Sequence, residues 1–341
     1  MKILLIGGSG FIGQFVAERL FAGGHNVTLV HRGGTGGSLL HHGVRHILGD
    51  ANQLRDLRPQ LRGSAPDTVV NFILSSSRQA REMMTALDGI AARLVVLSSM
   101  DVYRACGVLH ETESGGLQEL PLTEDSELRT QPAYTRQQME MGKRLFAWMD
   151  DDYEKIDVER VVLSDPKLPA TVLRLPMIYG PGDRLRFSRF YPVIKRIQDQ
   201  RRKILFEEDA ARWRASKGYV ENVADAIVVA ATSDAATSHI YNVAEENTLT
   251  ELEWAQLIAT EMSWDGEFVV LPPKDTPAHL RFPGDLKQHW IASSERIRQE
   301  LEYREAVSRT EAMRRTIKWE CENPPSDIPQ QLFNYAAEDA A

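Results

Sequence analysis

Short apolar runs alternate with amphipathic stretches along the first half of the chain. The runs contain β-branched and aliphatic residues without polar alternation, which predicts strands that are buried on both faces of a sheet. We place these strands at 2–6, 27–30, 45–48, 68–73, 93–97 and 171–175. Between the first two, apolar residues at helical spacing predict a helix from about 10 to 22, which Gly23 and Gly24 end. This alternation indicates a parallel sheet with crossover helices.

The second half of the chain mixes helical patterns with short strands. Its clearest elements are an amphipathic segment at 251–262 and a last helix at 309–322, without an internal repeat or an obvious linker. We expect an α/β fold, with a Rossmann-type doubly wound parallel sheet and a smaller C-terminal substrate lobe. Residues 1–175 should form the sheet domain, and residues 176–341 mainly the lobe, interleaved with the sheet. The polar stretch 106–132 is predicted as a long excursion, either a functional lid or an inert surface insertion.

Composition and charge narrow the class of protein. The 341 residues are 43% hydrophobic and 26% charged, no apolar run nears membrane-spanning length, and the short apolar start reads as a strand rather than a signal peptide. Cys106 and Cys321 show no disulfide or metal-ligand pattern, which predicts reduced thiols in a cytoplasmic protein. The net charge of −8 argues against a nucleic-acid partner. Three histidines without nearby carboxylates predict no metal site: His41, His42 and His46.

A glycine-rich turn follows the first predicted strand directly. Gly7 permits the tight turn, Gly10 lets the backbone approach phosphate oxygens, and Gly13 lets the next helix sit close to the sheet. The N-terminus of that helix offers free N–H groups and the positive end of its dipole. Placed between a strand and a helix, the turn predicts a site for the pyrophosphate of a nicotinamide cofactor, with Phe11 and Ile12 part of it. The domain at residues 1–175 is therefore expected to bind a dinucleotide.

The end of the second strand bears on the choice of cofactor. An acidic residue there would bind the adenosine ribose and indicate NAD, but this chain has His31 and Arg32. A guanidinium can pair with a 2′-phosphate, so we prefer NADP, with NAD as the alternative. Asp50, just after the third strand, is expected either to accept a hydrogen bond from the adenine amino group or to cap a helix at 51–57.

Several further motifs follow in chain order. They are LSSMDVY at 97–103, LRLPMIYGPGD at 173–183 and KGYVENVADA at 217–226. With the glycine spacing, these segments resemble the extended short-chain dehydrogenase/reductase family, in its NAD-dependent epimerase/dehydratase group. The resemblance implies that Ser99, four residues before Tyr103, is catalytic. It also implies that Pro176 borders the nicotinamide and that Tyr179 borders the substrate.

The chain departs from this family at the catalytic tyrosine–lysine pair. The family places the tyrosine four residues before the lysine, but Tyr134 is followed at that distance by Gln138. Lys155 matches the family's Lys-x-x-x-Glu context, so we assign it as the lysine that holds the nicotinamide ribose and promotes ionisation of the tyrosine. The tyrosine position in this register holds Asp151, and the nearest tyrosine is Tyr153.

Helix geometry limits how Tyr153 can act. Two residues along a helix are about 200° apart, so a helical Tyr153 would point away from Lys155. The acidic run 150–152 is typical of a helix start, which would put Tyr153 in a first turn with less fixed geometry. We prefer Tyr153 as the acid/base. Tyr134, Asp151 (which can instead form an ion pair with Lys155) and the lack of a conventional acid remain open.

Two further features concern the substrate and the assembly. Arg212 and Arg214, on either side of Trp213, lie where the family holds a substrate phosphate, although a solvated arginine pair around a packed tryptophan is an equal interpretation. The connection at 75–92 has room for one short helix, at 78–87. In the family this region builds the dimer interface, so both a monomer and a homodimer remain open.

The expected function is an NAD(P)-dependent epimerase/dehydratase or reductase that acts on a sugar-like or carbonyl small molecule. Ser99 would hydrogen-bond the reacting oxygen, Tyr153 would exchange its proton, and Lys155 would hold the nicotinamide ribose. The alternative is a non-catalytic NAD(P)-binding regulator or an RNA-binding relative of the same fold.

Overall fold

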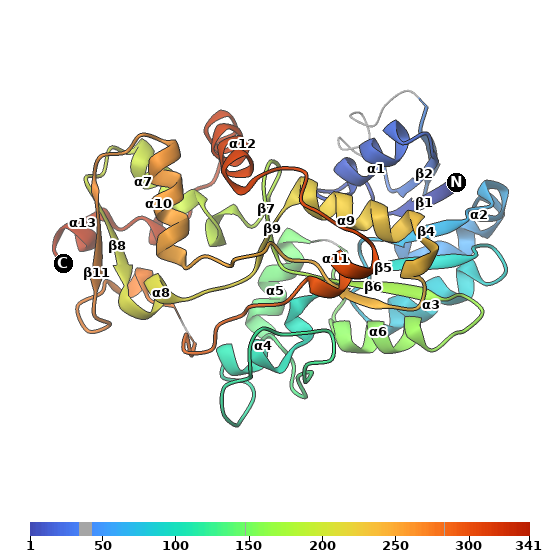
Figure 1. The fold of residues 1–341 in the computed structure, drawn as a ribbon, viewed down its shortest axis with the longest axis horizontal. Coiled ribbons are helices and arrows are strands. Elements are labelled where there is room, and N and C mark those ends of the chain that lie inside the picture. The colour runs from blue at the N-terminus through green and yellow to red at the C-terminus, as the bar shows by residue number, and fades with distance from the viewer. Residues whose placement is uncertain (34–42, 147, 283) are drawn as a thin grey trace.

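A parallel sheet of seven strands forms the core of the half of the protein that lies on the right in Figure 1. The computed structural model describes residues 1–33, 43–146, 148–282 and 284–341. The strand order is β10-β6-β5-β4-β1-β2-β3, and every neighbouring pair is parallel. The strands are β1 (Lys2–Ile6), β2 (Asn26–His31), β3 (Arg45–Leu48), β4 (Thr68–Asn71), β5 (Arg93–Ser99), β6 (Ala170–Leu175) and β10 (Ile240–Asn242). The predicted Rossmann-type sheet is confirmed.

Helices cover both faces of this sheet. They are α1 (Gly13–Ala22), α2 (Arg58–Ser64), α3 (Ser77–Leu87), α6 (Lys155–Leu163) and α9 (Val220–Thr232). In β1, Ile3 and Leu5 pack on the side of α1 and α9, whereas Leu4 and Ile6 pack on the side of α3 and α6. Successive side chains of a strand point to opposite faces, so a doubly covered strand needs apolar residues throughout. Figure 1 shows α1 and α9 above the sheet and α3 and α6 below it.

The sequence placed these elements correctly but misplaced some of their ends. The strands at 2–6 and 45–48 agree residue for residue with β1 and β3, and the short helix at 78–87 is α3. The first helix begins at Gly13 rather than at 10, because residues 10–12 belong to the glycine turn and Ile12 is the N-cap residue. Strand β4 ends at Asn71 rather than at 73, where the Asn71 side chain accepts a hydrogen bond from the N–H of Ile73 at 2.9 Å.

Most residues after β6 build a smaller C-terminal lobe, which lies on the left in Figure 1. Its elements are β7 (Met177–Tyr179), α7 (Tyr191–Gln198), β8 (Lys203–Glu207), α8 (Glu208–Arg212), β9 (Lys217–Tyr219), α10 (Glu251–Glu261), β11 (Glu267–Leu271), α12 (Arg309–Glu322) and α13 (Tyr335–Asp339). Helix α11 (Glu295–Glu300) instead packs on the sheet, next to β10. The chain returns to the sheet in between, because α9 packs on it and β10 pairs with β6. The expected interleaving is present, and the boundary at 175 stays a prediction.

The polar stretch 106–132 alternates between exposed positions and buried positions that anchor it to the rest of the protein. It follows the start of α4 (Arg104–Leu109). The fully buried Leu122 donates its N–H to the carbonyl of Ile291 at 2.7 Å, and the N–H of Gln118 donates to the Gln288 side chain at 2.6 Å. These bonds join the sheet half of the molecule to the C-terminal lobe. The stretch is therefore firmly tied into the fold, and the choice between a functional lid and an inert insertion stays a prediction.

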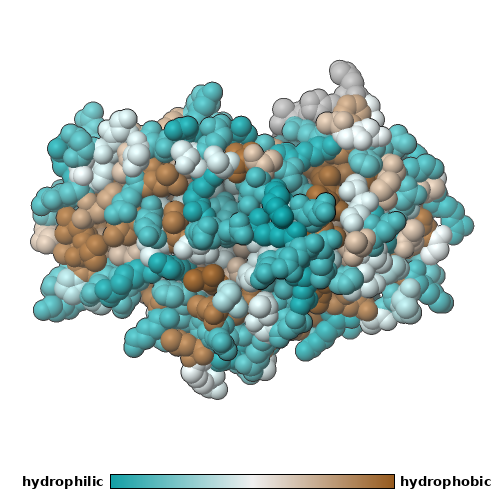
Figure 2. Space-filling view, in the orientation of Figure 1, coloured by the Kyte–Doolittle hydropathy of each residue, from teal (hydrophilic) through white to brown (hydrophobic). Residues whose placement is uncertain are grey.

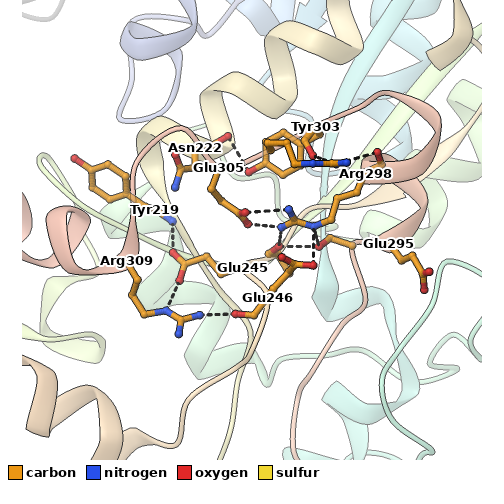
Figure 3. Close-up of polar contacts among 12 residues, drawn as sticks. Tyr219, Asn222, Glu245, Glu246, Glu295, Arg298, Tyr303, Glu305 and Arg309 are labelled. Carbon is orange, nitrogen blue, oxygen red and sulfur yellow. Dashed lines mark hydrogen bonds and ion pairs between the residues drawn. The ribbon is translucent and has the colours of Figure 1, made fainter.

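A network of charged side chains fastens the C-terminal segment next to α9 and β10 (Figure 3). Glu245 accepts hydrogen bonds from the N–H of Tyr219 at 3.0 Å and from Nε of Arg309 at 3.1 Å. Arg298 forms an ion pair with Glu305, with one N–O distance of 2.9 Å. A buried charge is tolerated when it is paired and hydrogen-bonded. The network therefore has a structural role.

The outer surface is mainly hydrophilic, as Figure 2 shows, with apolar residues gathered at the end of the molecule where Figure 1 places β8 and β11. Val270 of β11 is 43% exposed there. These apolar residues form a local group at the end of the C-terminal lobe, whereas single exposed apolar residues elsewhere are common on protein surfaces. Within the described ranges, the structure has no helix that is both long and apolar enough to cross a membrane.

Candidate active site

A cavity of about 1120 Å³ runs from the glycine turn, past the carboxyl ends of the strands, into the C-terminal lobe. The carboxyl ends of the strands are where folds of this type bind ligands. The cavity brings together most of the predicted site residues: Gly7, Gly10, Phe11, Ile12, Gly13, Arg32, Asp50, Ser99, Tyr153, Lys155 and Pro176. Segments far apart in the sequence therefore meet around one space.

The glycine turn has the geometry that a pyrophosphate needs. Gly7 has a φ of +79°, which favours glycine, and a Cβ atom on Gly13 would lie 2.4 Å from the Cα of Gly8. A Cβ on Gly10 would meet nothing nearer than 3.7 Å, so the space above this residue is open to a ligand. Ile12 precedes α1 without a side-chain cap, and although the N–H of Gln14 donates to the carbonyl of Gly10 at 3.2 Å, the start of the helix still offers N–H groups to a ligand. The turn therefore fits a dinucleotide.

The adenosine end of the cavity is bordered by Arg32 and Asp50. Arg32 is exposed just after β2. Asp50 accepts a hydrogen bond from the N–H of Asn52 at 2.9 Å, so the predicted helix cap is confirmed, and its contact with adenine stays a prediction. His46 lies 3.0 Å from His31, between ring nitrogens. His41 and His42 lie outside the described residues.

Ser99 and Lys155 occupy the middle of the cavity. Ser99 ends β5, and its Oγ accepts a hydrogen bond from the N–H of Asp101 at 3.2 Å. The buried Lys155 begins α6, and its Nζ donates to the carbonyls of Leu74 at 2.5 Å and Leu97 at 3.0 Å. An ammonium has three donors, so one stays available to a ligand. Burial lowers the pKa of Lys155 to about 8.

Tyr153 reaches the same cavity because it precedes the helix. Helix α6 begins at Lys155 with Glu154 as its cap, so Tyr153 is not helical. It therefore does not have to point away from Lys155, and both residues line the cavity. The predicted helix start at the acidic run 150–152 was wrong. Asp150 instead accepts a hydrogen bond from Oγ of Ser76 at 2.5 Å. The predicted ion pair of Asp151 with Lys155 was also wrong, because Asp151 pairs with Lys143.

Asp101 is a cavity residue that the sequence reasoning missed. It is 1% exposed, and its Oδ2 accepts hydrogen bonds from the hydroxyls of Tyr153 at 2.7 Å and Tyr134 at 3.3 Å. Burial and the neighbouring carboxylate raise the pKa of both tyrosines well above the usual value. Its position two residues after Ser99 is a signal that could have found it, since both lie at the end of β5.

The structure does not bring the predicted substrate residues into this cavity. Tyr179 is fully buried, and its hydroxyl donates to Glu245 at 2.8 Å. Arg212 is exposed at the end of α8 and pairs with Glu208 at 2.8 Å. Arg214 is exposed as well, and neither arginine lines the cavity, although Trp213 between them does. The solvated-pair interpretation is the one that the geometry favours.

A different arginine enters the lobe end of the cavity. Arg189, after β7, lines the wall beside Phe190 and Trp254, and it forms no ion pair with any residue in the described part of the chain. Burial lowers the pKa of its guanidinium, although the group stays charged. Arg196, by contrast, is paired with Glu338 at 2.6 Å. In Arg189, Nε donates to the carbonyl of Ile178 at 3.4 Å and Nη1 to Ser188 at 3.1 Å, and the carboxylates of Asp183 and Glu251 act on the group electrostatically. Nη2, which has no hydrogen-bond acceptor in the described ranges, is therefore the part of this half-buried guanidinium that an anion could contact.

Comparisons with known proteins agree with this architecture. Residues 3–244 match the model of the NAD dependent epimerase/dehydratase family. The uncharacterized protein y4nL of Sinorhizobium fredii is 22% identical, over 95% of this chain and 96% of its own length. Pal from Bacillus thuringiensis has a similar structure, with a TM-score of 0.68 and 20% identity, covering 94% of this chain and 99% of that one.

Two further solved structures share the fold. The dTDP-glucose 4,6-dehydratase from Bacillus anthracis, in complex with NAD, has a TM-score of 0.67 at 16% identity, covering 95% of this chain and 97% of its own. The UDP-glucose 4-epimerase from Thermotoga maritima, with UDP-glucose, has a TM-score of 0.65 at 16% identity, covering 94% of this chain and 99% of that one. At these identities the likeness concerns the fold.

Proposed function

The chain belongs to the NAD dependent epimerase/dehydratase family, and on that premise we propose that it is an NAD(P)-dependent epimerase, dehydratase or reductase of a sugar-like or carbonyl substrate. The observation that carries the proposal is one cavity lined by the glycine turn, Ser99, Tyr153 and Lys155. Dinucleotide binding and acid–base chemistry need these groups within reach of one substrate.

The chain's own residues have distinct roles in this proposal. The N–H groups at the start of α1 bind the pyrophosphate, and Lys155 uses its remaining donor on the nicotinamide ribose. A bound nicotinamide supplies a place for a hydride and its electron pair. Ser99 orients the reacting oxygen, and Tyr153 exchanges a proton with it. The apolar wall of Phe190, Trp213 and Trp254 limits the access of water.

The substrate in this proposal has an anionic group that binds at Arg189. Support comes from the position of this arginine in the cavity wall without an ion-pair partner among the residues described. A similar fold has been solved with UDP-glucose, which makes a nucleotide-linked sugar a suitable first candidate. Arg212 and Arg214 have no part in the proposed site.

NADP selectivity remains a hypothesis that rests on Arg32. The family model and the dehydratase structure compared above name NAD, so they give the hypothesis no support. The argument for NADP is that an exposed guanidinium borders the adenosine end of the cavity. Titration with both cofactors decides between them.

The test has two stages. Fluorescence titration with NADH and NADPH measures binding, and a panel of sugar nucleotides and simple carbonyl compounds measures turnover. We expect Ser99→Ala to bind the cofactor normally and to lose about 100-fold or more in turnover, since a general acid–base arrangement contributes about 10²–10⁴. Failure to bind either cofactor would overturn the proposal. Tight binding without turnover of any compound would favour the non-catalytic regulator.

A further inference from the structure

Asp101 presents an acceptor atom that the protein does not use. One carboxylate oxygen, Oδ2, accepts from Tyr153 at 2.7 Å and from Tyr134 at 3.3 Å. The other oxygen, Oδ1, is buried and has no hydrogen-bond partner within the described residues. Leaving a buried acceptor unpaired costs about 1–3 kcal/mol, and more for a charged group. The carboxylate therefore keeps an unused acceptor atom, on a side chain that lines the cavity.

Charged and titratable groups surround this carboxylate from several elements. They are Arg129, Tyr134, Glu154, Lys155, Cys106 and His110. Arg129 is held by Glu154 through two bonds of 2.7 Å, and its Nε donates to the backbone carbonyl of Asp101 at 2.7 Å. Lys155 donates to two backbone carbonyls. The carboxylate's own hydrogen bonds therefore go to the two tyrosines.

We propose that Asp101 and Tyr153 act as one acid–base couple, in which Tyr153 contacts the reacting hydroxyl and Asp101 receives the tyrosine proton. This inference rests on the proposed function. The Tyr153 hydroxyl points its hydrogen at Asp101, so its oxygen is free to accept a hydrogen bond from the substrate. Tyr134, at the longer distance, steadies the carboxylate as a positioning residue.

The proton transfers balance. The substrate O–H bond breaks and its proton bonds to the Tyr153 oxygen, while the tyrosine's own proton leaves for Oδ2 of Asp101, which becomes neutral. The carbon–oxygen double bond would form as the C–H bond breaks, and the oxidised nicotinamide dinucleotide that the proposed function requires would take up the hydride. The reverse reaction returns each proton along the same path. Tyr153 is neutral before and after the step.

The couple differs from a tyrosinate held by a lysine. The charge closest to the Tyr153 hydroxyl is an anion, and burial together with that anion raises the pKa of Tyr153 well above the usual value. These surroundings keep the tyrosine protonated at neutral pH. A carboxylate that accepts the proton removes the need for a free tyrosinate.

The test compares Asp101→Asn with Asp101→Glu. We expect Asp101→Asn to lose about 100-fold or more in turnover at neutral pH, in the range of a lost acid–base group, and its remaining rate to rise with pH because Tyr153 then has to ionise. The wild type should not show this rise. Asp101→Glu should restore part of the rate and the wild-type pH profile. A purely structural role would not change the shape of that profile.

Ultraviolet difference titration measures the ionisation of the tyrosines, so it tests the acid–base couple without any substrate. Comparison with Tyr153→Phe assigns the part of the titration that belongs to Tyr153. That ionisation should begin at a lower pH in Asp101→Asn than in the wild type. Tyr335→Phe is a matched control. Tyr335 is the first residue of α13, its hydroxyl also donates to a carboxylate, that of Asp199, at 2.5 Å, and it does not line the cavity. It should leave turnover and the pH profile unchanged.

The outcomes separate the two proposals. An unchanged pH profile together with an unchanged tyrosine titration in Asp101→Asn would overturn the couple, whatever the enzyme's substrate. Absence of cofactor binding in the wild type would overturn the proposed function, while the titration would still report on the carboxylate and the tyrosine.

Discussion

The two ends of the cavity are built from different parts of the chain. At the sheet end, backbone atoms of one continuous turn, from Gly7 to Gly13, form the site. At the lobe end, the wall comes from side chains of separate segments, such as Arg189, Trp213 and Trp254. A site made by backbone needs glycine at fixed spacing and so has a local signature. A site made by side chains from distant segments has no such spacing.

The largest effect is expected where backbone forms the site. A Cβ on Gly13 would lie 2.4 Å from backbone atoms of Gly8, and backbone cannot rotate away as a side chain can. Gly13→Ala should weaken cofactor binding by about 100-fold or more, since overpacking costs about 1–3 kcal/mol and occasionally more. Fluorescence titration measures this change. Gly116→Ala, where a Cβ meets nothing within 4 Å, is the control; an equal loss in both variants would contradict the contrast between backbone and side-chain sites.

Lys155 gives the next largest effect, in the pH dependence of stability. Burial lowers its pKa from 10.5 to about 8, so between these values the unfolded chain holds the proton and the native protein does not. The free energy of unfolding should therefore rise with pH in this window, by on the order of 3 kcal/mol in total.

Urea denaturation from pH 8 upward measures this rise. In Lys155→Met it should be missing, whereas Lys318→Met, at an exposed position of α12, should keep it. If the free energy of unfolding changed with pH in the same way in the wild type and in Lys155→Met, the lysine would stay protonated in the native protein.

A smaller effect is expected at the side-chain end. Arg189→Gln should weaken the binding of UDP by about 10- to 100-fold, as for one charge-assisted hydrogen bond, and leave uridine binding unchanged. Arg212→Gln, an exposed and paired arginine, should change neither. Calorimetry measures both ligands. If Arg212→Gln has the larger effect, the anion binds outside the cavity, as the sequence pattern first indicated.

The smallest effect concerns cofactor choice. Arg32→Ser should weaken NADPH binding by about 10-fold, the scale of an exposed charged contact, and leave NADH unaffected. Equal binding of the two cofactors by the wild type, unchanged in the variant, would show that the protein does not select between them and would leave Arg32 as a surface residue.

The catalytic centre lies between these two cases. The strand-five motif identified Ser99, and the Lys-x-x-x-Glu context identified Lys155, because both follow local patterns; their catalytic roles stay predictions. Tyr153 was uncertain because its position depends on where α6 begins, and that start is set by Glu154 and its partner Arg129. Asp101 was missed, since its two tyrosine partners lie 33 and 52 residues away in sequence.

The sequence by itself determined the order of strands and helices, the doubly covered sheet and the glycine turn. Each depends on local periodicity or on a conformation that only glycine adopts easily. The tertiary structure decided which arginine enters the cavity and which carboxylate meets Tyr153. Those contacts depend on how segments distant in the chain pack together, and a side chain's charge does not reveal whether an acidic neighbour already satisfies it. For that reason Arg212 and Arg189 could be told apart only in the folded protein.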